Sequence, residues 1–159
     1  MKRFLFACGT RDTTASFGLL VLRVVIGSMM LYGHGWPKLQ NFSKIAESFP
    51  TPDFVPLNWM SSTVSLSACI AAELLCAALL VMGLLSRHAA FAIGFTMVVA
   101  AFQVGAEAPL FLGPGVAAAK EPALLYLVIM IVLILTGPGR FSLDGIIDKP
   151  RKGGLKISL

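Results

Sequence analysis

The chain is poor in charge and lacks the short motifs that mark most cofactor sites. Charged residues make up only 13% of its 159 residues, and it contains two histidines and three cysteines. It has no CxxC pair, haem motif, dinucleotide fingerprint or metal-ligand spacing. We therefore assign no metal ligands and no cofactor motif, and we expect any electron path to need a partner protein.

The three cysteines do not predict a disulfide framework. Cys8 precedes the first apolar segment, whereas Cys69 and Cys76 are seven positions apart in the second. On a helix that spacing is about 10 Å of rise, which is too far for a disulfide. We interpret these cysteines as small apolar packing residues.

Apolar residues, in contrast, are abundant. They make up 57% of the chain, and the mean hydropathy of +0.83 is too high for a soluble domain of this length. Four apolar segments occupy about residues 17–36, 64–85, 89–106 and 122–137. The last two are shorter than the ~20 residues that a straight membrane-spanning helix needs, so they require support from neighbouring helices or local bilayer thinning. The prediction is an all-α, polytopic four-helix transmembrane bundle formed by a single domain over residues 1–159.

The cations predict the orientation of the bundle. With the N-terminus inside, nine cations are cytoplasmic and three are outside. The cytoplasmic set is Lys2, Arg3, Arg11, Arg87, Arg140, Lys149, Arg151, Lys152 and Lys156, and the outer set is Lys38, Lys44 and Lys120. Both tails, residues 1–16 and 138–159, are then cytoplasmic. The net charge of +5 is a topology signal and an attraction to anionic lipids, and nucleic acid is not expected as a partner because no basic stripe is interleaved with aromatics.

Two ionisable residues lie inside apolar segments, Arg23 in the first and Glu73 in the second. An unpaired charge at that depth costs about 2.5 to 3.5 kcal/mol on insertion scales, which calls for a partner or a function. Each residue belongs to a helical stripe of small or polar residues, so the two stripes are expected to face each other. We predict a salt bridge between Arg23 and Glu73. It is either a structural lock or a proton or ligand site.

A second group of polar and aromatic residues is expected at the outer membrane surface. Its members are Tyr32, His34, Trp36, Lys38, Gln103, Glu107, Lys120, Glu121 and Tyr126. One interpretation is an interfacial belt of aromatic residues and snorkelling cations; the other is a pocket for a small polar or quinone-like molecule. Pro37 is expected to end or kink the first helix there.

The candidate site residues come from these two groups. The candidate ligand-binding residues are Arg23, His34, Trp36, Lys38, Glu73, Gln103 and Tyr126. The candidate catalytic residues are His34, Lys38 and Glu107.

Two connecting segments are punctuated by proline and glycine. The outer loop between the first two helices contains Pro50, Pro52 and Pro56, and it either re-enters the interface or covers the mouth of the bundle. After the fourth helix, residues 137–139 read Gly-Pro-Gly, a helix stop, and Ser142 is a suitable cap for a short interfacial helix.

Four strings occur in the order LLVLRVVIGSMMLYGHGWPKL, AAELLCAALLVMGLLSR, KEPALLY and TGPGRFSLD. Together they resemble the DoxX family of small bacterial membrane proteins, and the resemblance extends over about residues 17–147. It implies a compact four-helix bundle in the inner membrane. The positions that match the family pattern are Arg23, His34, Gly35, Lys38, Glu73, Arg87, Gly137, Pro138, Gly139, Arg140 and Asp144. The chain departs from the pattern at Gly105 and Ala108, where many relatives carry a histidine and an aspartate.

The resemblance implies a link to redox chemistry without fixing one activity. Relatives are associated with thiosulfate:quinone oxidoreduction, oxidative stress and membrane redox complexes, so one hypothesis is a small membrane subunit of such a system, holding a quinone in its outer cavity. If the chain is enzymatic, it is a quinone-linked oxidoreductase subunit. The alternative is a non-enzymatic module for anchoring, assembly or small-solute transport. The candidate partners are the lipid bilayer, a soluble or membrane redox protein, and a second copy of the chain.

Overall fold

The computed structural model describes residues 9–10, 12–116 and 118–148, and within them every regular element is a helix. The α-helices are α2 (Thr13–Met30), α3 (Trp36–Gln40), α4 (Phe42–Ile45), α5 (Ser62–Ile70), α6 (Ala77–Met82), α7 (Ser86–Val99), α8 (Glu121–Thr136) and α9 (Leu143–Ile147). Three π-helical turns, η1 (Leu31–Gly35), η3 (Ala71–Cys76) and η4 (Ala100–Val104), and one 3₁₀ turn, η2 (Leu57–Trp59), complete the set. Cys8 and the predicted cytoplasmic cations at positions 2, 3, 11, 149, 151, 152 and 156 lie outside the described residues.

These elements join into four long rods, as the apolar segments predict. Three continuous helices, Thr13–Gln40, Ser62–Met82 and Ser86–Val104, are long and apolar enough to cross a membrane. The fourth, α8, has 16 residues and is shorter. Large apolar side chains cover the outside of the rods: Leu135 is 73% exposed, Phe91 67% and Val128 58%. Such a surface suits lipid, and the fold is the predicted all-α membrane bundle.

The first rod runs four residues further than predicted, because Pro37 neither ends nor sharply interrupts it. Residues 31–35 form the π turn η1, and Pro37 then occupies the first turn of α3. Proline is tolerated in membrane helices where a local π turn adjusts the backbone bonding around its missing N–H, and η1 directly precedes α3, which contains Pro37. Of the two predicted outcomes, an end or a kink at Pro37, the end is wrong, because the helix continues to Gln40; Lys38 therefore extends from helical backbone.

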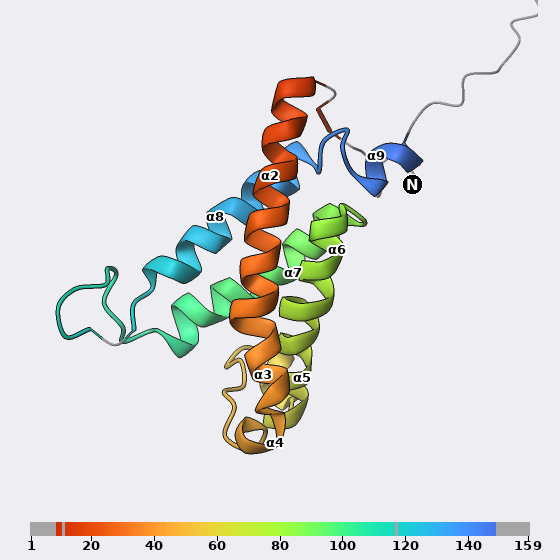
Figure 1. Cartoon of the computed structure of the whole chain (residues 1–159). Coiled ribbons are helices and arrows are strands. Elements are labelled where there is room, and N and C mark those ends of the chain that lie inside the picture. The colour runs from red at the N-terminus through yellow and green to blue at the C-terminus, as the bar shows by residue number, and fades with distance from the viewer. Residues whose placement is uncertain (1–8, 11, 117, 149–159) are drawn as a thin grey trace, which may run out of the picture.

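The rods pack as two hairpins that cross. Figure 1 shows α2 alongside α6, with α7 and α8 running beside each other at an angle to them. The core lies where the hairpins meet and contains Met30, Leu80, Ile93, Met130 and Leu133, all fully buried. Gly94 on α7 contacts the Met130 side chain, since a Cβ added there would lie 3.3 Å from its Cβ.

Both ends of the described chain lie at the same end of the bundle. The start of α2 and the segment leading to α9 are neighbours in Figure 1, and the Arg140 backbone N–H donates to Ser16 Oγ over 3.1 Å. The helix stop after Thr136 is present, with Gly137 at a φ of 73°. Ser142 caps α9 as predicted, because its hydroxyl accepts from the Gly145 N–H.

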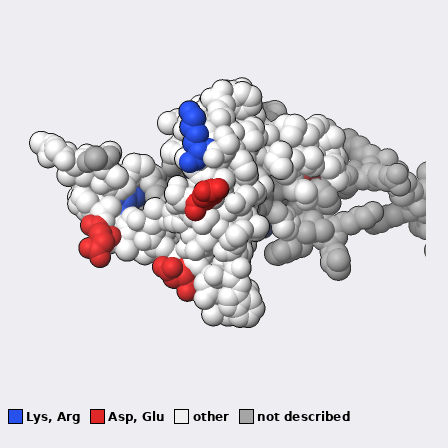
Figure 2. Space-filling view, turned by 90° about the horizontal axis from the view of Figure 1, so that it is seen from below, with Lys and Arg blue, Asp and Glu red and all other residues white. Residues whose placement is uncertain are grey.

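The opposite end is covered by the loop between α4 and α5. Phe42, Ile45 and Phe49 pack against a small cluster formed by Ala46, Leu66 and Ile70. Further along, Phe54 meets Phe95 of α7 edge to face, with ring centroids 5.9 Å apart. Figure 2 looks onto this end and shows separate charged side chains of both signs on a largely uncharged surface.

Candidate functional site

An ion pair between Lys38 and Glu73 lies at the end of the bundle that carries α3 and α4. Lys38 reaches from α3 and Glu73 from η3, so the pair joins the first two rods. The side chain of Glu73 is 3% exposed and that of Lys38 26%. Gly35 permits this approach, because a Cβ there would lie 2.8 Å from the Glu73 carbonyl oxygen. The Glu73 side chain is therefore buried, and that of Lys38 is partly exposed.

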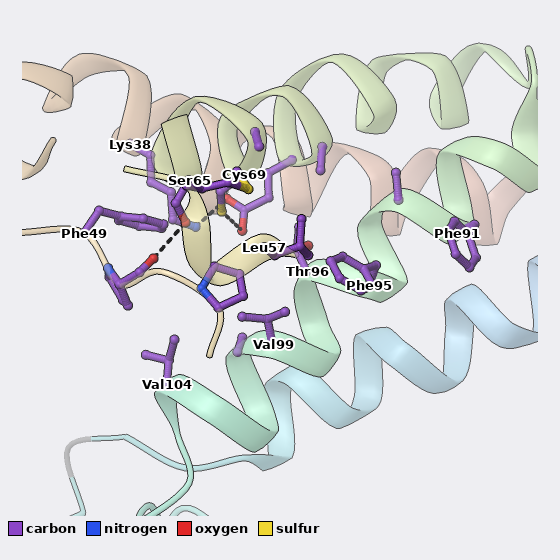
Figure 3. Close-up of a pocket in the computed structure, with 18 residues that line it drawn as sticks. Lys38, Phe49, Leu57, Ser65, Cys69, Phe91, Phe95, Thr96, Val99 and Val104 are labelled. Atoms are coloured by element: carbon purple, nitrogen blue, oxygen red, sulfur yellow. Dashed lines mark hydrogen bonds and ion pairs between the residues drawn. The ribbon is translucent and has the colours of Figure 1, made fainter. Parts of the chain in front are cut away.

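The pair lines a pocket of about 490 Å³ between α5, η3, α7 and the outer loop. Figure 3 shows the lining side chains. From the loop come Phe49, Pro50, Pro52, Leu57 and Met60, and from the second rod Ser65, Ala68, Cys69, Ala72 and Glu73. From the third rod come Phe91, Ala92, Phe95, Thr96, Val99, Ala100 and Val104. The loop thus covers the pocket, which is the second of its two predicted interpretations.

Most polar side chains of the pocket are already bonded to the protein. Ser65 Oγ donates to the Pro50 carbonyl over 2.8 Å, and Thr96 Oγ1 donates to the Ile93 carbonyl over 2.8 Å. The Cys69 thiol donates to Glu73 Oε1 over 3.4 Å. A lysine ammonium has three N–H donors, and the structure uses one of those of Lys38, on Glu73. Lys38 is therefore the lining residue with donors left for a ligand.

Three π turns surround this site. η1 directly precedes α3, η3 carries Glu73, and η4 contributes Ala100 and Val104 to the lining. η1 packs against η3, and η3 against α7. Such insertions are rare and are found often at functional sites, because they re-aim side chains without ending a helix.

The predicted salt bridge between Arg23 and Glu73 is wrong. The Arg23 guanidinium is fully buried and donates to the carbonyls of Leu80 (3.1 Å), Val81 (3.4 Å) and Phe141 (2.7 Å). Leu80 and Val81 belong to the last turn of α6, where carbonyl groups are short of partners within the helix; that of Leu80 also accepts from the Gly83 backbone N–H over 3.1 Å. A cation is also favourable at the negative end of a helix dipole. Arg23 therefore caps α6, about 10 Å of helix rise from Glu73.

Asp144 completes this second polar cluster, at the end opposite the pocket. It is 1% exposed and accepts from the backbone N–H groups of Leu85 and Ser86 (both 2.9 Å) and from the Ser86 hydroxyl (3.0 Å). It thereby caps the start of α7 and lies within electrostatic range of Arg23. We call Arg23, Gly83, Ser142 and Asp144 the capping cluster. The resemblance pointed to Asp144; no sequence signal singled out Gly83.

None of the remaining candidate residues lines the pocket. His34 contacts the Tyr126 ring edge to face, with centroids 5.6 Å apart, and is within electrostatic range of Lys38 and Glu73. The π turn places Gly35, not His34, on the buried stripe. Trp36 and Glu107 are exposed, whereas Gln103 has a buried Oε1 atom without a hydrogen-bond partner. Of the seven predicted ligand-binding residues, Lys38 and Glu73 line the pocket.

Sequence reasoning missed the apolar walls of the pocket. Phe95 and Val99 read as ordinary membrane-helix residues, and no local pattern indicates that the loop folds against them. Among the residues that the structure describes, no three His, Cys, Asp or Glu side chains are grouped to hold a metal ion.

Comparison with known proteins identifies the family. The DoxX family profile matches residues 18–106, which is more than half of the chain. The chain is also 28% identical to an uncharacterized protein of Haemophilus influenzae, over 94% of this chain and 97% of that protein. No solved structure matches. The chain belongs to the DoxX family of membrane proteins.

Proposed function

We propose that this DoxX protein is a small inner-membrane subunit of a redox-linked system and that it binds a quinone in the Lys38–Glu73 pocket. The observation that carries the proposal is an apolar pocket of about 490 Å³ that contains one cation with free donors. Pockets for small molecules are typically of about 300–1,000 Å³, mostly apolar, with a few polar groups that fix orientation.

The residues present fit a quinone head. Phe49, Leu57 and Phe95 supply apolar walls for a flat ring, and Lys38 supplies N–H donors for a carbonyl oxygen. Glu73 orients the ammonium through the ion pair, which limits the entropy lost when a ligand accepts from it. An oriented cation also stabilises negative charge that develops on a bound oxygen.

A bound quinone would take up two electrons and two protons to form a quinol. Lys38 is suited to pass a proton to the ligand oxygen, because it lines the pocket and its side chain is 26% exposed. His34 and Glu107 stay proton-handling candidates that would act from outside the lining. Because the sequence has no electron-carrier motif, we propose that a soluble or membrane partner protein with a redox centre supplies the electrons.

We further propose that the pocket end of the bundle faces outward and that both termini are cytoplasmic. The asymmetry of the cations supports this orientation, and the two described ends lie together. A reporter protein fused after Leu159 should fluoresce as a cytoplasmic protein does, and a cysteine introduced at Lys44 should react with an impermeant thiol reagent from outside. An external C-terminus would overturn the orientation.

The proposal is tested by purification in lipid nanodiscs, mass spectrometry of bound molecules and titration with a short-chain quinone. The wild-type protein should retain or bind a quinone, and Lys38→Met should weaken binding by about tenfold or more, since tenfold corresponds to ~1.4 kcal/mol. Lys44→Met is the matched control, because Lys44 is an exposed cation at the same end outside the lining. Purification of a stable protein partner with no quinone bound would instead favour the anchoring or assembly module.

A further inference from the structure

We infer that the ligand of this pocket has an uncharged, hydrogen-bond-accepting head and a long apolar tail, and that it enters sideways from the lipid between α5 and α7. The inference rests on the proposed function and narrows it. It assigns the tail to the wall formed by α7, and it excludes an anionic substrate from the same pocket.

The charge of the head follows from the ion pair. The ammonium of Lys38 is neutralised by the carboxylate of Glu73, which lies in the same lining and is 3% exposed. The described lining contains no second cation. An anion placed beside Lys38 would lose its hydration and meet the negative charge of Glu73, whereas a carbonyl group needs only a free N–H. The pair therefore favours an uncharged acceptor over a carboxylate or an inorganic oxyanion.

The tail follows from the length and polarity of the pocket. The lining residues of the third rod extend from Phe91 to Val104, about 20 Å of helix at 1.5 Å per residue. Figure 3 shows Lys38 and Cys69 at one side of the pocket and Phe91 at the opposite side. The one hydroxyl on this wall, that of Thr96, is bonded to the Ile93 carbonyl. The wall therefore offers an apolar track that leads away from the polar end.

The route of entry follows from the exposure of that track. Phe91 is 67% exposed and Phe95 38%, so the end of the pocket away from Lys38 opens on the flank of the bundle. This flank belongs to a membrane-spanning helix and faces lipid. The outer loop contributes Phe49, Pro52 and Leu57 to the lining and covers the side toward the aqueous phase. A tailed molecule can thus reach Lys38 without leaving the membrane.

The charge of the head is tested with two ligands that carry the same decyl chain, a benzoquinone and a carboxylate. Affinities are measured in nanodiscs at equal mole fractions in the lipid. We expect the wild-type protein to prefer the quinone by about tenfold or more. Glu73→Gln leaves Lys38 as an uncompensated cation, so it should reverse the preference. Glu47→Gln is the control, because Glu47 is an exposed acid at the same end. Equal affinities in the wild type, or no change in Glu73→Gln, would overturn this part of the inference.

The tail is tested by filling the far end of the track. Ala92→Trp places a large ring in the lining beside Phe91, whereas Val98→Trp, on the same helix, lies outside the lining and is the control. Ala92→Trp should weaken binding of the decyl quinone by about tenfold, because the ring occupies space that the tail needs. Binding of the same quinone without its tail should be unchanged. Equal losses for both quinones, or no loss, would overturn the assignment of the tail.

Separate results would overturn the quinone site and the inference about the head and tail of its ligand. If neither the tailed nor the tailless quinone binds the wild-type protein, the proposed function itself falls. If both bind, but without the expected dependence on head charge and on Ala92→Trp, the quinone site stands and only the inference is wrong.

Discussion

The two ends of this bundle use buried charge in different ways. In the capping cluster, Arg23 and Asp144 bond to backbone groups of other elements. At the other end, Lys38 and Glu73 bond to each other and line a pocket. A buried charge that bonds to backbone groups at helix ends stabilises the fold, whereas an ion pair that lines a cavity can also bind a ligand. Burial alone does not distinguish the two roles, because Arg23 and Glu73 are both buried.

The largest loss of stability is expected for Asp144→Ala. The substitution leaves the buried Ser86 N–H and hydroxyl and the partly buried Leu85 N–H without an acceptor, which should lower the free energy of unfolding by about 3 to 5 kcal/mol. Thermal unfolding in nanodiscs measures it. Asp12→Ala is the control, since Asp12 caps α2 at an exposed position and its loss should cost only about 1 kcal/mol. Similar losses of unfolding free energy for both variants would show that the capping cluster is not a major source of stability.

The second largest loss of stability is expected for Gly83→Ala, which should lower the free energy of unfolding by about 2 to 4 kcal/mol. Gly83 has a φ of 71°, and an added Cβ would lie 2.3 Å from Arg23 Nη1 and 2.5 Å from Ser142 Cβ. The cost combines a left-handed backbone with a clash against packed atoms. Gly18→Ala is the matched control, because nothing lies within 4 Å of that position and the helix should be unchanged or slightly more stable. A wild-type melting temperature for Gly83→Ala would contradict the packing described for Arg23.

His34→Ala tests whether the ligand site at the pocket end extends beyond the lining residues. It removes the edge-to-face contact with Tyr126, a contact worth about 0.5 to 1.5 kcal/mol. Because His34 does not line the pocket, quinone affinity should stay within about twofold of the wild type, a change of ~0.4 kcal/mol. Tyr126→Phe keeps the ring and should behave as the wild type does. A large loss of affinity in His34→Ala would extend the site beyond the lining residues.

The sequence predicted the helices well, for reasons that are local. Four apolar segments, the stop at residues 137–139 and the cap at Ser142 each depend on residues that are close in the chain. The partner of Arg23 was not predictable in the same way. Helical periodicity placed Arg23 and Glu73 on facing stripes, but it does not fix the relative height of two rods. The carbonyl groups that Arg23 contacts carry no signal in the sequence.

The pocket shows a second limit of sequence reasoning. Glu73 was recognised because a charge is costly in a membrane, and Lys38 because it belongs to the polar and aromatic group expected at the outer surface. Their pairing depends on η1 and on the close approach of Gly35 to Glu73. π turns shift the register by one residue and have no reliable sequence signature. That shift moved His34 off the buried stripe, and it left Lys38 directed at Glu73.

We propose that Lys38 and Glu73 bind a ligand and do not stabilise the fold. The most direct test is the double variant Lys38→Met/Glu73→Met, measured for both melting temperature and quinone affinity in the same nanodiscs. Replacing a buried ion pair with apolar residues of similar volume is often neutral or stabilising, so the double variant should melt at or above the wild-type temperature. It should also lose quinone binding by about tenfold or more. Wild-type affinity in a normally folded double variant would contradict the account.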